Sequence, residues 1–141
     1  EDPALRERVV HAAERAHAHK FIRDLPNGYQ TVVGDRGVRL SGGQRQRLFV
    51  ARELFKEPNL LLLDEATSDL DTASEQHIQD SIDALKGEVT VVIIAHRLST
   101  VKNADRVYVL DEGRVIESGS YHELRNREDG QFREMVEMQS L

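Results

Sequence analysis

The spacing of apolar residues near the beginning of the chain predicts a helix. They recur every three or four positions from Leu5 to Ala16, which places them on one helical face, and Pro3 suits the first turn. The pattern therefore predicts a helix over 3–19. A short apolar element follows at 21–25, and the Pro-Asn-Gly sequence after it predicts a turn.

A second helix is predicted to begin just after Ser41. Serine is a preferred N-cap, and the helical stretch behind it extends from about Gly43 to Lys56, before Pro58. The residues between the two predicted helices, 29–39, contain two glycines and are predicted to form a loop. Arginines recur on this second helix, and the default expectation for them is a solvated face: Arg45, Arg47 and Arg52.

Two short apolar runs have the character of strands. Residues 59–64 carry four successive leucines, and residues 89–96 are rich in β-branched side chains, so both are predicted to be fully buried strands. Between them, a polar helix with an apolar inner face is predicted over 72–86, closed by Gly87.

The remaining residues predict a short helix, a β-hairpin and two further helices. Alternating segments at 106–110 and 114–117 flank an Asp-Glu-Gly turn, and the helices are expected near 120–127 and 129–139. The element order predicts an α/β core preceded by an all-helical segment.

Composition narrows the classes of function. Of 141 residues, 39% are hydrophobic and 31% charged, as in ordinary globular proteins, and the formal net charge of -6 argues against a nucleic-acid partner. The absence of cysteine excludes disulfides and thiolate metal sites. No apolar run approaches the roughly 18 residues of a transmembrane helix, so any membrane-spanning part is expected elsewhere.

The first candidate for chemistry is the glycine-rich start of the second helix. Its two glycines allow close approach of a ligand, and a helix N-terminus offers N–H donors and a positive dipole end. The hydroxyl of Ser41 adds another donor, so the segment is a candidate anion site. The alternative is an ordinary capped helix start.

Acidic residues and a histidine at the strand ends form the second candidate. Asp64 and Glu65 follow the first strand, where one carboxylate could hold Mg²⁺ and the other could orient or deprotonate a water. His96 ends the second strand and could contact a phosphate. The alternatives are a charged strand exit and a structural histidine, and Asp71 could simply be a helix N-cap. The other histidines lie on predicted helices with no convincing metal-ligand spacing: His11, His17, His19, His77 and His122.

Taken together, these segments resemble the ABC ATPase family. LSGGQRQR, then LLLLDEATSDLD, then IIAHRLST occur in the family's order and spacing, and the resemblance covers essentially the whole chain. It implies an α/β, partial P-loop NTPase fold. Residues 1–57 would be the helical (signature) subdomain, and residues 58–141 the C-terminal part of the RecA-like ATPase core.

The resemblance also implies roles for the candidate residues toward ATP and Mg²⁺. The signature motif would contact the γ-phosphate of ATP bound to the opposite subunit of a head-to-tail dimer, through Ser41, Gly42, Gly43 and Gln44. Asp64 matches the Walker B aspartate on the Mg²⁺ side, and Glu65 the glutamate that polarises the attacking water. His96 matches the switch histidine, and Asp71 ends the D-loop, which communicates across the dimer.

Two further stretches of the sequence indicate the exporter subtype of the family. TVVGDRGVRLSGGQ and AHRLSTVKNADRVYVLDEGRVIESGSYHEL resemble type-I exporters of the multidrug and lipid kind. The resemblance implies that Thr31–Gly37 contacts the coupling helices of a transmembrane domain, at the cytoplasmic face of a membrane. Glu53 and Asp69 stand where alanine is common in the family, but both flank the motifs.

No G-x-x-x-x-G-K-[ST] motif occurs in these 141 residues. The backbone nest and lysine that grip the β- and γ-phosphates are therefore missing, and we expect a fragment that is inactive alone. Two alternatives stay open at this point. One is an ABC-type ATPase of DNA repair or chromosome maintenance, and the other is a non-catalytic regulatory module.

Overall fold

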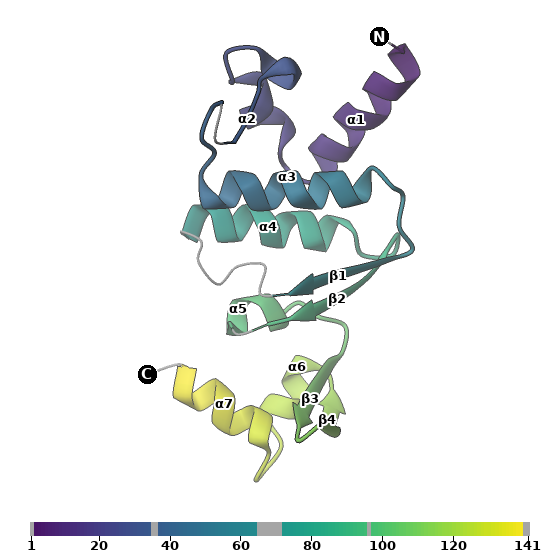
Figure 1. Ribbon diagram of the computed structural model, residues 1–141. Helices are drawn as coiled ribbons and strands as arrows, with labels where there is room; N and C mark the ends of the chain where they lie inside the picture. Colours follow the sequence, from purple (N-terminus) through teal and green to yellow (C-terminus); the bar gives the residue numbers. More distant parts are fainter. Residues whose placement is uncertain (1, 35–36, 65–71, 96, 140–141) are drawn as a thin grey trace. The chain divides into compact units, whose positions relative to one another are not determined.

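The computed structural model describes residues 2–34, 37–64, 72–95 and 97–139 (Figure 1). The chain divides into two compact units, Glu1–Ile94 and Ala95–Leu141. The first unit contains α1 (Pro3–Arg15), α2 (His19–Arg23), η1 (Gly28–Gln30), α3 (Gly42–Leu54), β1 (Leu60–Asp64), α4 (Thr72–Ala84) and β2 (Thr90–Ile94). The second contains α5 (Leu98–Val101), β3 (Val107–Asp111), β4 (Arg114–Gly119), α6 (Tyr121–Arg125) and α7 (Gln131–Gln139).

The first helix is shorter than the sequence predicted. Asp2 caps α1 by accepting a hydrogen bond from the Ala4 N–H, but the helix ends at Arg15 instead of reaching residue 19. The backbone turns at His17, which has a φ of 52°, and the Ala18 N–H then donates to the Ala13 carbonyl at 2.7 Å. This left-handed C-terminal turn redirects the chain into α2.

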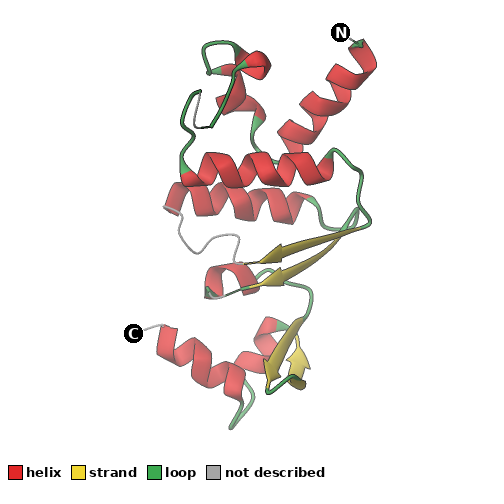
Figure 2. Ribbon diagram, in the orientation of Figure 1, coloured by secondary structure: helices red, strands yellow, loops and turns green. Residues whose placement is uncertain are grey.

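The core of the first unit lies between the helices and one face of a parallel strand pair. β1 and β2 are parallel with Leu62 opposite Val92, and α4 is the crossover between them, as parallel neighbours require (Figure 2). α3 and α4 lie side by side and in contact (Figure 1). The buried apolar side chains lie on or beside α1, α2, α3, β1 and α4, with Val91 and Ile93 of β2 partly buried against them: Ala12, Ala13, Ala16, Ala18, Ile22, Val50, Ala51, Leu54, Leu61, Leu63, Ile78, Ile82 and Leu85.

The expectation of fully buried strands was wrong for the described residues. Leu61 and Leu63 are buried, but Leu60 is 58% exposed and Leu62 62% exposed. Val92 and Ile94 on β2 are also exposed. Side chains alternate between the two faces of a strand, and within this unit the helices cover only one face.

The second unit is built on the predicted hairpin. β3 and β4 are antiparallel, with a register shift between Val109 and Leu110, and the turn between them has positive φ at Glu112 and Gly113. Such a turn matches the twist of the two strands. A second core cluster forms here from Val107, Val109, Tyr121, Leu124, Phe132 and Val136.

The predicted boundary between the subdomains 1–57 and 58–141 lies inside the first unit and stays a prediction. Among the described residues, none of the helices has both the length and the apolar character that crossing a membrane requires.

Candidate functional site

The glycine-rich segment begins α3 with a reciprocal cap. The Gln44 N–H donates to Ser41 Oγ at 3.2 Å, and the Ser41 N–H donates to Gln44 Oε1 at 2.9 Å. This capping box confirms the predicted N-cap and fixes where the helix starts. It also means that Ser41 and Gln44 hold each other in place before any ligand arrives.

The two glycines between them leave the helix end accessible. Gly42 is exposed and Gly43 is buried, and within the described part of the chain no acceptor is bonded to either N–H. No acidic side chain occupies the first turn of α3, so the positive end of the helix dipole is not neutralised there. Chemically, this end of α3 suits an anion with several oxygen atoms, such as a phosphate.

Asp64 supplies the other described part of the predicted site. It is the last residue of β1, its side chain is exposed, and its Cα pairs with that of Ile94 at the end of β2. Both strands point toward the side of the unit on which α3 and α4 begin (Figure 1). Asp64 and Ser41 belong to different elements, and no hydrogen bond or ion pair joins them among the described residues.

Three of the predicted site residues fall outside the described part of the chain: Glu65, Asp71 and His96. In the sequence, Glu65 directly follows the end of β1, and His96 comes two positions after the end of β2. Their predicted roles are therefore not tested by the geometry. Asp35 and Arg36, which belong to the predicted contact segment Thr31–Gly37, are also outside the described part of the chain.

The described part of this segment forms a tight turn. Val33 and Val38 form an isolated bridge, and the Val38 N–H donates to the Val32 carbonyl at 2.9 Å. Gly34 has a φ of +104°, and a Cβ atom at Gly37 would collide with the Val32 carbonyl oxygen. The turn presents Val32 with 67% of its surface exposed, which gives the segment an apolar tip.

The arginines of α3 differ in their surroundings, and for Arg47 the expected solvated face is wrong. Arg47 Nη1 donates to the His17 carbonyl at 2.9 Å, and Nε donates to the Gly43 carbonyl at 3.4 Å. Its guanidinium also lies 5.0 Å from the centre of the Phe21 ring. A single side chain therefore ties the signature helix to the end of α1.

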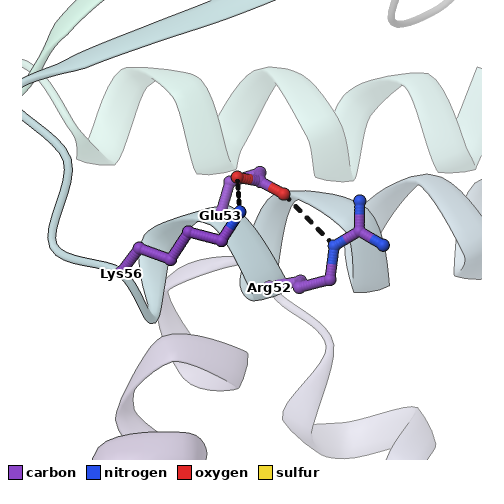
Figure 3. A network of polar contacts seen from close by, with 3 residues as sticks. All are labelled: Arg52, Glu53 and Lys56. Carbon is purple, nitrogen blue, oxygen red and sulfur yellow. Dashed lines mark hydrogen bonds and ion pairs between the residues drawn. The ribbon is translucent and has the colours of Figure 1, made fainter.

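The C-terminal end of α3 carries an exposed charge network (Figure 3). Glu53 accepts hydrogen bonds from Lys56 Nζ at 2.6 Å and from Arg52 Nε at 3.2 Å. The hydrogen bond from Lys56 is the main reason that the pKa of Glu53 is lowered, and Arg52 adds to the effect. The network lies at the opposite end of α3 from the glycines, which agrees with the interpretation that Glu53 leaves the motif chemistry intact.

One pairing was missed by sequence reasoning. The imidazole rings of His17 and His77 are stacked, with centroids 6.2 Å apart and an interplanar angle of 26°. His17 lies in the turn after α1 and His77 lies on α4, so no local spacing could have indicated the pair.

Comparison with known proteins decides the family. The family model described as "ABC transporter" matches residues 2–68, which include the start of α3 and the whole of β1. The chain is 59% identical over 121 residues to an ATP-dependent lipid A-core flippase of Methylobacillus flagellatus. The chain belongs to the ABC transporter family.

Other members of the family are similar over the whole of this ABC transporter chain. ABC transporter B family member 18 of Arabidopsis thaliana is 50% identical over 141 residues. A solved structure of a bacterial Atm1-family ABC exporter with ATP bound has a TM-score of 0.85, with 47% identity and all of this chain covered. The predicted partial P-loop NTPase fold is therefore confirmed.

The chain spans only a small share of the proteins it matches. It covers 21% of the M. flagellatus flippase, 11% of the A. thaliana transporter and 24% of the Atm1-family exporter chain. For the flippase, the matched segment is 86% of the present chain.

Proposed function

We propose that this chain is part of the ATP-hydrolysing motor of an ABC exporter, which couples ATP hydrolysis to transport across a membrane. The observation that carries the proposal is the start of α3, where a capping box fixes the exposed Gly42 and the buried Gly43, whose N–H groups have no acceptor among the described residues. Further support is the similarity to a flippase over 86% of the chain, and to an ABC transporter and an ABC exporter over all of it.

In this proposal, the start of α3 binds the γ-phosphate of ATP held by a second nucleotide-binding domain. Ser41 and Asp64 would then serve different ATP molecules of a head-to-tail dimer. Ser41 offers its hydroxyl, and Gly42 and Gly43 offer backbone donors. Phosphoryl transfer depends mostly on positioning and electrostatic stabilisation, which fixed donors of this kind supply.

Asp64 fits the proposed magnesium role. Its carboxylate is exposed at the carboxyl end of a parallel strand pair, where ligands of α/β sheets bind. Among the described residues, there is no group of three or more His, Cys, Asp or Glu side chains that could hold a metal. One carboxylate together with substrate phosphates is nevertheless a usual way of holding Mg²⁺, which would neutralise charge on the phosphates.

Glu65, His96 and Asp71 complete the proposed site. Glu65 would orient and polarise the attacking water, and His96 would hydrogen-bond to the γ-phosphate. Asp71 would contact the partner domain. The support for the first two roles is that Glu65 and His96 follow adjacent parallel strands, whose carboxyl ends share one edge.

The proposed partners are a second nucleotide-binding domain and the coupling helices of a transmembrane domain. The turn within Thr31–Gly37 supports the second contact, because its exposed Val32 offers apolar surface. The chain would then work at the cytoplasmic face of the membrane. The alternative functions, in DNA repair or as a non-catalytic module, are not favoured, since the relatives described above are transporters and exporters.

The proposal is tested by Mg-ATP binding and turnover in two settings. The 141-residue chain alone is expected to show neither, because it contains no P-loop motif. In the full-length protein, Glu65→Gln is expected to abolish turnover while ATP still binds.

Glu88→Gln is the matched control, since it makes the same chemical change at a residue whose side chain forms an ion pair with Arg15. It is expected to leave turnover within about twofold of the unmodified protein. Full turnover in the Glu65→Gln protein would refute the catalytic assignment. Turnover by the 141-residue chain that is lost on Glu65→Gln would refute the claim that the P-loop must come from elsewhere.

A further inference from the structure

His17 and His77 face each other across the surface of the first unit. Their ring centroids are 6.2 Å apart, and both side chains are exposed. In the described part of the chain, no hydrogen bond engages a ring nitrogen of either residue. Each imidazole therefore has a nitrogen atom available for a ligand.

The backbone on both sides of the pair is held firmly. Ala16 and Ala18, which flank His17, are completely buried, and Arg47 holds the His17 carbonyl. On α4, Ile78 is completely buried beside His77. The two histidines thus project from fixed points, and only their side chains need to rotate.

The separation of the rings suits a single metal ion between them. Imidazole nitrogen binds transition metals at about 2.0–2.1 Å, and the nitrogen lies about 1.1 Å from the ring centroid. Two imidazoles on one ion therefore have centroids roughly 5–6.4 Å apart, depending on the angle between them at the metal. The observed 6.2 Å lies near the upper end of this range, where the two nitrogens are almost opposite each other on the metal. The rings must turn from stacked to edge-on, and a tetrahedral ion would also require them to move about 1 Å closer.

The donors also select the class of ion. Neutral imidazole suits Zn²⁺, Cu²⁺ and Ni²⁺, whereas Mg²⁺ and Ca²⁺ require oxygen ligands. The Arg47 guanidinium, which binds the His17 carbonyl, is directed to the carbonyls of His17 and Gly43 and stacks on Phe21. Because the pair is exposed, water can complete the coordination shell.

We propose that His17 and His77 form a two-histidine site for a borderline divalent transition metal, which cross-links the end of α1 to α4. Such an ion binds both rings only when the unit is folded. It therefore stabilises the folded state and restrains the turn that connects α1 to α2, independently of the nucleotide site.

The test is a Ni²⁺ titration of the 141-residue chain by calorimetry, with thermal unfolding followed in parallel. Two tethered imidazoles bind more tightly than one, because the second contact is intramolecular. His17→Asn and His77→Gln are each expected to weaken Ni²⁺ binding about tenfold or more, and the loss of binding free energy in the double variant is expected to be smaller than the sum of the two single losses. Saturating Ni²⁺ is expected to raise the unfolding midpoint by roughly 5 °C or more in the unmodified chain, but not in the His17 and His77 variants.

His11→Gln is the matched control, since His11 is an exposed histidine on α1. It removes one imidazole and is expected to change neither the affinity nor the midpoint. Independent, additive effects of the two single variants would overturn the proposal, because they would show two separate one-histidine contacts. Loss of binding in His19→Gln but not in His77→Gln would overturn it too, as would the absence of binding by the unmodified chain.

Discussion

Ser41 and Gln44 each accept a hydrogen bond from the other's backbone N–H at the start of α3. The same exchange joins Ser120 and Glu123 at the start of α6. The described residues thus include these two capping boxes of one design, and only the first of the two carries glycines between its members. The second can serve as an internal reference for the first.

Ser41→Ala and Ser120→Ala are expected to lower the free energy of unfolding by similar amounts, about 1 kcal/mol each, because each removes one N-cap acceptor. Their effects on ATP turnover in the full-length protein should differ. Ser41→Ala is expected to reduce turnover roughly tenfold or more, since it also removes a proposed phosphate donor. Denaturant unfolding and steady-state turnover measure the two effects. Equal turnover in the two variants would argue that Ser41 is only a cap.

The turn at Gly37 is expected to be intolerant of a side chain. In Gly37→Ala the new Cβ would strike the Val32 carbonyl oxygen, which accepts the Val38 N–H. The backbone must then shift, so the Val38 N–H is expected to exchange with solvent at least about tenfold faster. Gly28→Ala is the control for backbone strain without a clash, because its φ of +50° disfavours alanine while a Cβ there meets no atom within 4 Å, so exchange at Val38 is expected to stay unchanged. Unchanged exchange at Val38 in Gly37→Ala would show that the turn accommodates the methyl group.

Glu117 is expected to stabilise the second unit through α7. Its side chain is 9% exposed, and Oε2 accepts the Phe132 N–H at 2.8 Å, near the start of that helix. A carboxylate in this place satisfies an N–H of the first turn and interacts favourably with the helix dipole. Glu117→Gln is expected to lower the free energy of unfolding by about 1–2 kcal/mol, as measured by denaturant titration.

Glu137→Gln provides the comparison for Glu117, since Glu137 forms an exposed ion pair with Arg133 one turn away on the same helix. Its removal is expected to change stability by less than about 0.5 kcal/mol. If both variants lost the same stability, the position of Glu117 at the helix start would have no special effect.

Local signals in the sequence predicted the elements that depend on neighbours along the chain. Ser41 is a cap because of contacts three residues away, and Gly87, with a φ of +83°, lies just after α4 as predicted. The end of α1 escaped prediction because the left-handed residue is His17, which carries none of the usual signals of a helix stop. The burial of its two alanine neighbours decides the turn there.

Features that depend on distant packing could not be predicted. The four leucines of β1 resemble a strand buried on both faces, yet the exposure of Leu62 depends on what covers the outer face. Arg47 lies far along the chain from the His17 carbonyl that it binds. Of the proposed site, the fold confirms the capped start of α3 and the place of Asp64 at a strand end. Anion binding at the α3 start and the roles of Glu65, Asp71 and His96 stay predictions.

Glu53 is expected to make the stability of the chain depend on pH in the acid range. The hydrogen bond from Lys56, with help from Arg52, lowers the pKa of Glu53 in the folded state. A lowered folded-state pKa adds stability that is fully present above the unfolded pKa, about 4.3, and is lost as the pH falls through the folded value. Glu53→Gln removes this contribution, so the stability difference between the two proteins is expected to be constant above about pH 5.5 and to shrink below about pH 4.

Unfolding measured at several pH values, with carboxyl titration by NMR, checks this dependence. The backbone N–H and side chain of Ser120 also lower the pKa of Glu123, but that residue is present in both proteins and its effect cancels in the difference. Because the network at Glu53 is exposed, 1 M salt should reduce the difference at neutral pH. A Glu53 carboxyl that titrates at or above its ordinary pKa would contradict the prediction, and the network in Figure 3 would then add nothing to stability.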